Sequence, residues 1–183
     1  MNLTQLVLPT MRAQHAGKIV NISSIGGQLY SPLGGWYYAS KHALEALSDS
    51  LRLEVASFGI DVIIIEPGGT NTEWASVMAD KLRAATPANS AYKKMAATFG
   101  MPMSGQMGNF ATVADIAKLI HQAITARHPA THYQPRWQEK LMVLATRKLS
   151  YRQFDRIAMH TVNTLLKKEC KHLITDRILH SSR

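Results

Sequence analysis

The sequence has very little cysteine and no long apolar stretch. Cys170 is the only cysteine in 183 residues, which excludes a disulfide framework and a cysteine-based metal site within the chain. Such usage is typical of reducing compartments, and we predict a cytoplasmic protein. Apolar runs such as that at residues 62–65 are far shorter than the ~20 residues of a membrane span. The first residues, MNLTQLVLPTMR, also lack the basic, apolar and small-residue order of a signal peptide.

Acidic residues are scarce too, and the charges are unevenly distributed. The chain carries 21 Lys and Arg against 12 Asp and Glu, a net charge of +9. Residues 134–183 hold eleven basic and four acidic residues, so most of the excess lies in this C-terminal segment. Its charges are interspersed with Leu, Ile and Ala rather than with stacking aromatic residues. This favours solvated helix faces and no nucleic-acid partner. A basic interaction module is the alternative, and salt-sensitive binding to polyanions would reveal it.

Apolar periodicity predicts one βαβ unit near the N-terminus. Short apolar runs bounded by turn formers predict buried strands at residues 18–23 and 61–65. A loop rich in Gly, Ser and Pro and a long helix over about 36–57 lie between them, and a helix over 3–14 precedes them. Gly59 is a natural stop for the long helix. A strand, a helix and a strand of these lengths predict parallel pairing and an α/β fold.

The remainder of the chain is predicted to be irregular first and helical later. Residues 70–110 contain several Pro, Gly and Met residues, and we expect no regular structure there. Thr112 is a candidate N-cap, and Asp115 completes a capping-box pattern at the start of the next helix. The sequence THYQP predicts a short last strand, and two helices are expected over roughly 136–149 and 151–168.

Two adjacent tyrosines and a lysine near the start of the long helix are candidates for acid–base chemistry. On a helix, Tyr37 and Lys41 lie about 40° apart and Tyr38 and Lys41 about 60° apart. An ammonium group beside a phenol stabilises the phenolate, which makes the phenol a usable acid and base. Ser24 follows the first strand, where open parallel sheets place their ligand crevices. Spacing alone does not choose between the two phenols, and it is equally found on ordinary amphipathic helices.

A longer pattern selects Tyr37. Residues 17–74, GKIVNISSIGGQLYSPLGGWYYASKHALEALSDSLRLEVASFGIDVIIIEPGGTNTEW, resemble the catalytic half of a short-chain dehydrogenase/reductase. That family carries a Ser, a Tyr thirteen residues later, and a Lys in Tyr-x-x-x-Lys. Ser24, Tyr37 and Lys41 match both intervals, whereas Tyr38 matches neither. The resemblance implies that Tyr37 is the general acid in reduction and the base in oxidation. It also implies that Lys41 assists Tyr37 and binds the nicotinamide ribose, and that Ser24 orients the reacting oxygen.

The resemblance also implies a cofactor and an architecture. The family has a Pro-Gly-x-x-x-Thr turn against the nicotinamide of NAD or NADP, matched here by Pro67, Gly68 and Thr72, with the main chain near Thr70 meeting the carboxamide. The implied fold is a partial Rossmann-like, doubly wound parallel sheet with extra C-terminal helices.

The domain organisation and partners follow from the same resemblance. Residues 1–133 correspond to the catalytic half, with a variable substrate lid at about 70–110, and residues 134–183 to a basic helical extension. The methionines of the lid suit an apolar alcohol or carbonyl substrate, although they are equally compatible with core filling. The family commonly dimerises through the helix that bears Tyr37, where an alanine stripe would let a second helix approach.

The family's glycine-rich turn, which binds the pyrophosphate, is missing. No G-x-G-x-x-G spacing occurs, and the family's Asn-Ala-Gly strand end and helix asparagine are absent as well. We therefore expect the C-terminal part of a dehydrogenase without its first half, in which one edge of the strand at 18–23 is unpaired. Either the chain needs a partner at this edge, or Met1 is an internal methionine of a longer protein. Weak dinucleotide binding is expected, and a truncated, non-catalytic binding module is the alternative function. The residue that distinguishes NAD from NADP would lie in the missing half.

A metal site is not predicted. His128 and His132 are four residues apart, but Pro129 interrupts the helix that such a pair needs. No acidic third ligand is near them in the sequence. Glu66 is interpreted as a residue at a strand end.

Overall fold

The computed structural model describes residues 2–99 and 110–180. The chain divides into two compact units, and each is described by itself. The first, here called the sheet unit, comprises Met1–Thr70 and Ala111–Arg147, and the second, the helical unit, comprises Asn71–Phe110 and Lys148–Arg183. The boundary between residues 133 and 134 that the resemblance implies stays a prediction.

The sheet unit is built on three parallel strands, which confirms the predicted βαβ unit. β1 (Gly17–Ile22), β2 (Ile60–Ile65) and β3 (His132–Tyr133) lie in the order β1-β2-β3. β1 and β2 pair in parallel along their whole lengths, and β3 pairs with the end of β2. Five of the six residues of β2 are buried, as expected for a central parallel strand. Within the described residues β1 is an edge strand, as predicted.

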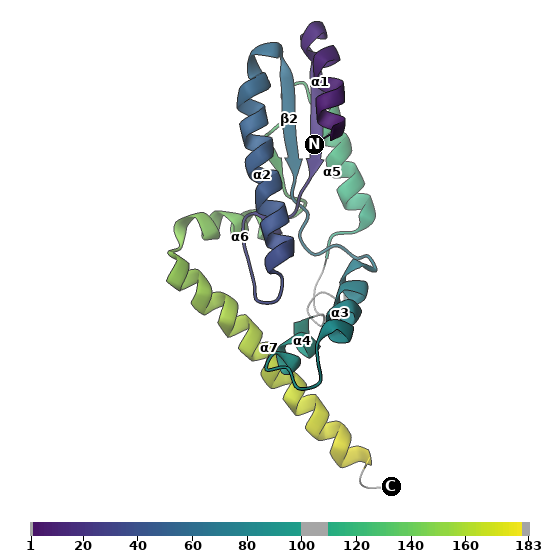
Figure 1. The fold of residues 1–183 in the computed structure, drawn as a ribbon, viewed down its shortest axis with the longest axis vertical. Coiled ribbons are helices and arrows are strands. Elements are labelled where there is room, and N and C mark those ends of the chain that lie inside the picture. The colour runs from purple at the N-terminus through teal and green to yellow at the C-terminus, as the bar shows by residue number, and fades with distance from the viewer. Residues whose placement is uncertain (1, 100–109, 181–183) are drawn as a thin grey trace. The chain divides into compact units, whose positions relative to one another are not determined.

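Helices cover both faces of this sheet because successive residues of a strand point to opposite sides. α1 (Asn2–Gln14) and α2 (Gly35–Val55) lie on one face, and α5 (Val113–Thr125) lies on the other, as Figure 1 shows. The core of the first face consists of Leu8, Ile19, Leu51, Val55, Ile60 and Val62. The core of the second face consists of Ile63, Ile65 and Ala123.

Helix boundaries follow local chemistry, as two sites illustrate. The capping box of α5 is confirmed, since Thr112 Oγ1 accepts from Asp115 N at 3.1 Å and the Asp115 carboxylate accepts from Thr112 N at 2.8 Å. After α2, Gly59 adopts a left-handed φ of 67°. A Cβ at that position would lie 2.6 Å from the carbonyl oxygen of His15, so the turn into β2 requires glycine.

The helical unit contradicts the predicted irregular segment over 70–110. α3 (Trp74–Ala85) and α4 (Lys93–Phe99) are regular helices. Ala75 and Ala79, one helical turn apart, are the buried residues of α3, and the first proline of the region lies beyond its end. The prolines and glycines thus mark where these helices stop. Met101, Met103 and Met107, on which the lid was partly predicted, lie outside the described residues.

The C-terminal helices are confirmed, and the last one is longer than predicted. α6 is Trp137–Lys148 and α7 is Tyr151–His180, against expected ends at about 149 and 168. Charged residues continue through α7 without a proline or glycine to end it. Among the described helices, α7 included, none has an apolar stretch that could cross a bilayer.

Candidate active site

Ser24 connects the end of β1 to the turn after β2. It is buried, and its side chain caps the short helix Ile25–Gly27 by accepting from Gly26 N at 3.0 Å. Its Oγ also donates to the carbonyl oxygen of Pro67 at 3.2 Å, and Ile25 N donates to the same oxygen at 3.0 Å. The structure therefore brings two motifs that are 43 residues apart into direct contact. A substrate oxygen near Ser24 would compete with the Pro67 carbonyl for the hydroxyl proton.

Tyr37 and Tyr38, in the first turn of α2, have different surroundings. The Tyr37 ring packs against the loop after Ser24, because a Cβ at Gly26 would lie 2.9 Å from Tyr37 Cε1. The Tyr38 hydroxyl forms a 2.7 Å hydrogen bond with Ser31 Oγ, and burial raises the pKa of this phenol. The two rings meet edge to face, with centroids 5.5 Å apart. Tyr38 is thus fixed by its hydrogen bond to Ser31, and both rings lie against Gly26 of the Ser24 loop, since the same Cβ would lie 3.2 Å from Tyr38 Cδ1.

Lys41 reaches the same end of β1. Its Nζ donates to the carbonyl oxygen of Ile22, the last residue of that strand, at 3.1 Å. Ile22 is two residues from Ser24, so the ammonium group is placed beside the loop on which Tyr37 packs. Ser24, Tyr37 and Lys41 therefore converge at the carboxyl end of β1, where parallel sheets bind ligands.

Part of the predicted nicotinamide turn lies beside Ser24, at the carboxyl end of β1. Pro67 contacts Ser24 as described, and Gly68 is closely approached by the Glu139 carboxylate. Thr70 forms an isolated parallel bridge with Ala111, which closes the turn. Thr72 belongs to the helical unit, where its hydroxyl accepts from the backbone N–H of Trp74, so its predicted place beside the other residues stays a prediction.

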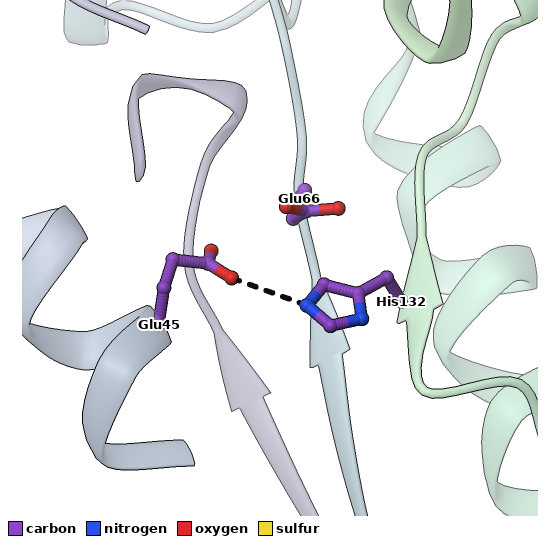
Figure 2. Close-up of side chains that lie close together, drawn as sticks. All are labelled: Glu45, Glu66 and His132. Atoms are coloured by element: carbon purple, nitrogen blue, oxygen red, sulfur yellow. Dashed lines mark ion pairs between the residues drawn. The ribbon is translucent and has the colours of Figure 1, made fainter. Parts of the chain in front are cut away.

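Three further ionisable residues gather beneath the turn, and the sequence did not indicate that they meet. Glu45 of α2, Glu66 directly after β2 and His132 of β3 point toward one another in Figure 2. Burial and the neighbouring Glu45 raise the pKa of Glu66. The Glu45 carboxylate beside it raises the pKa of His132, with further contributions from Glu66 and Asp49. The only sequence signal was that Glu45 follows Lys41 by one helical turn, which places it on the active-site side of α2.

Comparisons with known proteins agree with this geometry. Residues 1–83 match the family model described as short chain dehydrogenase. Retinol dehydrogenase 5 of Homo sapiens is 38% identical over 161 residues, which cover 79% of this chain and 48% of that protein. The chain spans about half the length of the curated relatives it matches.

Solved structures show the same fold. A short-chain dehydrogenase from Streptomyces avermitilis has a TM-score of 0.64 at 27% identity, over 87% of this chain and 57% of that one. A short-chain dehydrogenase/reductase from Burkholderia phymatum, solved in complex with NAD, has a TM-score of 0.58 at 25% identity, over 77% and 50% of the two chains. With its family model, its relatives and the Ser24–Tyr37–Lys41 pattern all in agreement, the chain belongs to the short-chain dehydrogenase/reductase family.

Proposed function

We propose that this chain is the catalytic part of an NAD- or NADP-dependent oxidoreductase that acts on an alcohol or carbonyl group of an apolar substrate. The supporting observation is the contact between Ser24 Oγ and the Pro67 carbonyl, which joins the proposed catalytic loop to the proposed nicotinamide turn. The Tyr37 ring packs on the proposed catalytic loop. Lys41 donates a hydrogen bond to β1, the strand that precedes this loop. From the family resemblance we propose that hydride transfer takes place beside these residues.

The side chains have distinct parts in the proposed reaction. When bound, the nicotinamide supplies the hydride in reduction and accepts it in oxidation. Ser24 holds the substrate oxygen by its hydroxyl group. Tyr37 donates its phenolic proton to that oxygen as the carbonyl is reduced, and removes the proton in the reverse direction. The Lys41 ammonium group stabilises the phenolate that forms.

The residues present fit one end of the dinucleotide. Hydroxyl and ammonium groups of Tyr37 and Lys41 are suited to a ribose, and the turn containing Pro67, Gly68 and Thr70 offers backbone groups to a carboxamide. No glycine-rich turn for the pyrophosphate occurs in the sequence, so we propose that these contacts supply only part of the affinity.

The apolar substrate class is supported by one relative. Human retinol dehydrogenase 5 is named for an apolar alcohol, and we propose an alcohol or carbonyl compound of that class for this chain. A homodimer through α2 is also proposed, because α2 exposes 93% of Trp36 and 74% of Leu53 beside its alanine stripe. A cytoplasmic setting stays a prediction from the single cysteine.

The test measures dinucleotide-dependent conversion of retinal to retinol. The purified chain is assayed at millimolar NADH or NADPH, with product separated by chromatography. A second protein carries the nucleotide-binding half of human retinol dehydrogenase 5 before residue 2. We expect slow conversion by the chain, faster conversion by the fusion, and loss of both in Tyr37→Phe. The proposed function would be rejected if neither protein converted retinal although the fusion is folded and binds dinucleotide.

A binding module is the second candidate function. The observation that favours it is the open edge of β1. Within the described residues no strand pairs with this edge, so its backbone groups are available to a strand of another protein. A module of this kind would show no dinucleotide-dependent conversion but would bind a partner through β1. The same assay therefore separates the two candidates.

A further inference from the structure

Three side chains from three separate elements form a buried cluster with the composition of a metal site. One ligand atom from each of Glu45, Glu66 and His132 lies within 4.8 Å of the others. Nε2 of His132 is 3.5 Å from Glu45 Oε2, the pair joined in Figure 2. Glu66 is fully buried and Glu45 is 5% exposed. Carboxylates are seldom buried to this extent without a cation.

Each carboxylate of the cluster has a hydrogen-bond donor on one of its two oxygens. Gln28 Nε2 donates to Glu45 Oε2 at 3.3 Å, and Gln134 Nε2 donates to Glu66 Oε2. The remaining oxygen of each carboxylate and Nε2 of His132 have no hydrogen-bond partner within the described part of the chain. Unpaired buried polar atoms are costly, and a bound cation would satisfy these three.

The histidine is oriented as in metal sites. His132 Nδ1 lies 3.0 Å from Thr131 Oγ1, and an Nδ1–H donated to this hydroxyl leaves the Nε2 lone pair directed at the two carboxylates. Metal-binding histidines characteristically donate their other ring N–H in this manner.

The charges also favour a divalent cation. Two buried carboxylates carry two negative charges, and Asp49 adds a third acidic group 3.8 Å from His132 Nε2. In the described residues, no Lys or Arg forms an ion pair with Glu45 or Glu66. A divalent ion would neutralise the two glutamates, with the His132 imidazole as the third ligand.

We propose that Glu45, Glu66 and His132 bind one divalent transition-metal ion, with Zn²⁺ as the best match. A nitrogen ligand disfavours Mg²⁺ and Ca²⁺, and a set of one His and two carboxylates leaves a fourth position for water. In a tetrahedral site with ligands at about 2.0–2.2 Å from the ion, ligand atoms lie about 3.3–3.6 Å apart, so binding would draw the most distant atoms together by up to about 1.5 Å.

The site would act as a positioning device for the active-site residues. Glu66 immediately precedes Pro67, and Glu45 follows Lys41 by one turn of α2. A metal ion would therefore fix the distance between α2 and the turn that Ser24 contacts. This role does not depend on the proposed hydride transfer, because metal binding is measured without substrate or dinucleotide.

The experiment is a metal titration of the full chain after dialysis against a chelator. Zn²⁺ and Mg²⁺ are titrated by calorimetry, Co²⁺ by visible absorption, and thermal unfolding is recorded with and without Zn²⁺. We expect one equivalent of Zn²⁺, a Co²⁺ spectrum of low coordination number, and no comparable binding of Mg²⁺. At free Zn²⁺ a hundredfold above Kd, Tm should rise by about 5–10 °C.

Matched variants assign the binding to the cluster. Glu66→Gln and His132→Gln keep the size of the side chain but remove a ligand, and each should weaken Zn²⁺ binding more than 100-fold. Thr131→Val removes the group that orients His132, and should weaken binding by about 10–100-fold. Glu54→Gln, exposed on α2, and His128→Gln, exposed near β3, are controls that should bind like the parent chain.

Three outcomes would overturn the proposal. The first is no saturable Zn²⁺ binding by the folded parent chain. The second is equal binding by the parent chain and the folded Glu66→Gln and His132→Gln variants. The third is loss of binding in His128→Gln alone, which would place the metal at a surface histidine.

Discussion

Replacing each tyrosine of the pair at the start of α2 should separate stability from catalysis. Tyr38→Phe removes the 2.7 Å hydrogen bond to Ser31 but keeps the ring and its edge-to-face contact with Tyr37. One neutral hydrogen bond contributes about 0.5–1.5 kcal/mol, so the free energy of unfolding should fall by about that amount. For a chain of this length, each kcal/mol lowers Tm by about 2–4 °C. Hydride transfer should be nearly unchanged.

Tyr37→Phe should have the opposite effect. The ring that packs on Gly26 is retained, so the change in unfolding free energy should stay within the ~1.5 kcal/mol of a single hydrogen bond. The proton donor is lost, however, and a positioned general acid contributes about 10²–10⁴-fold to the rate. Conversion of retinal should therefore fall at least about 100-fold.

Both variants are compared with the parent fusion by circular dichroism and by single-turnover conversion at saturating dinucleotide. Equal rate losses in the two variants would refute the assignment of Tyr37 as the acid. An unchanged Tm for Tyr38→Phe would refute the structural role given to its bond with Ser31.

Three further predictions concern the backbone, pH and the cofactor. Gly59→Ala should lower the free energy of unfolding, measured in urea, by at least about 1–2 kcal/mol. The reason is that Gly59 has a left-handed φ and that the new Cβ would meet the His15 carbonyl oxygen. Gly35→Ala is the control, because nothing lies within 4 Å of a Cβ at that position. Burial raises the pKa of Glu139 in the folded chain, so its contribution to stability is present below the unfolded pKa and is lost as pH rises through the folded pKa. Denaturation curves at several pH values should therefore show the Glu139→Gln variant to be more stable than the parent chain only at the higher pH. An identical pH dependence of stability in the two proteins would contradict this prediction. Calorimetry of the chain with NAD or NADP should give a Kd of about 1 mM, and a Kd near ~1 μM would reveal a phosphate site outside the residues discussed.

Much of the sheet unit could be predicted from local sequence because local chemistry specifies it. The apolar runs of β1 and β2 need burial on both faces, and a helix between them forces parallel pairing. The Thr112–Asp115 capping box is complete within four residues. The spacing of Ser24, Tyr37 and Lys41 is likewise readable along the chain, since one strand end and one helix turn carry all three.

α3 is a helix of the helical unit that the local sequence pattern did not predict. Its buried alanines provide a weak periodic signal, and the prolines and glycines that follow dominated the interpretation of the whole segment. Small buried residues contribute little apolar area, so only packing against other helices reveals their period.

The active-site geometry depended on the tertiary structure. The bond between Ser24 and Pro67 exists because β1 and β2 are in register, which places the residues after both strands side by side. The Glu45, Glu66 and His132 cluster needs α2, β2 and β3 to meet, and no interval along the chain relates a helix position to two strand ends. The sequence by itself determined most elements of the sheet unit, because these follow from short-range periodicity, whereas the choice of Tyr37 stays a prediction from the family resemblance. Only the tertiary structure decided which carboxylates share a buried site with His132, because burial and charge proximity arise when distant elements pack together.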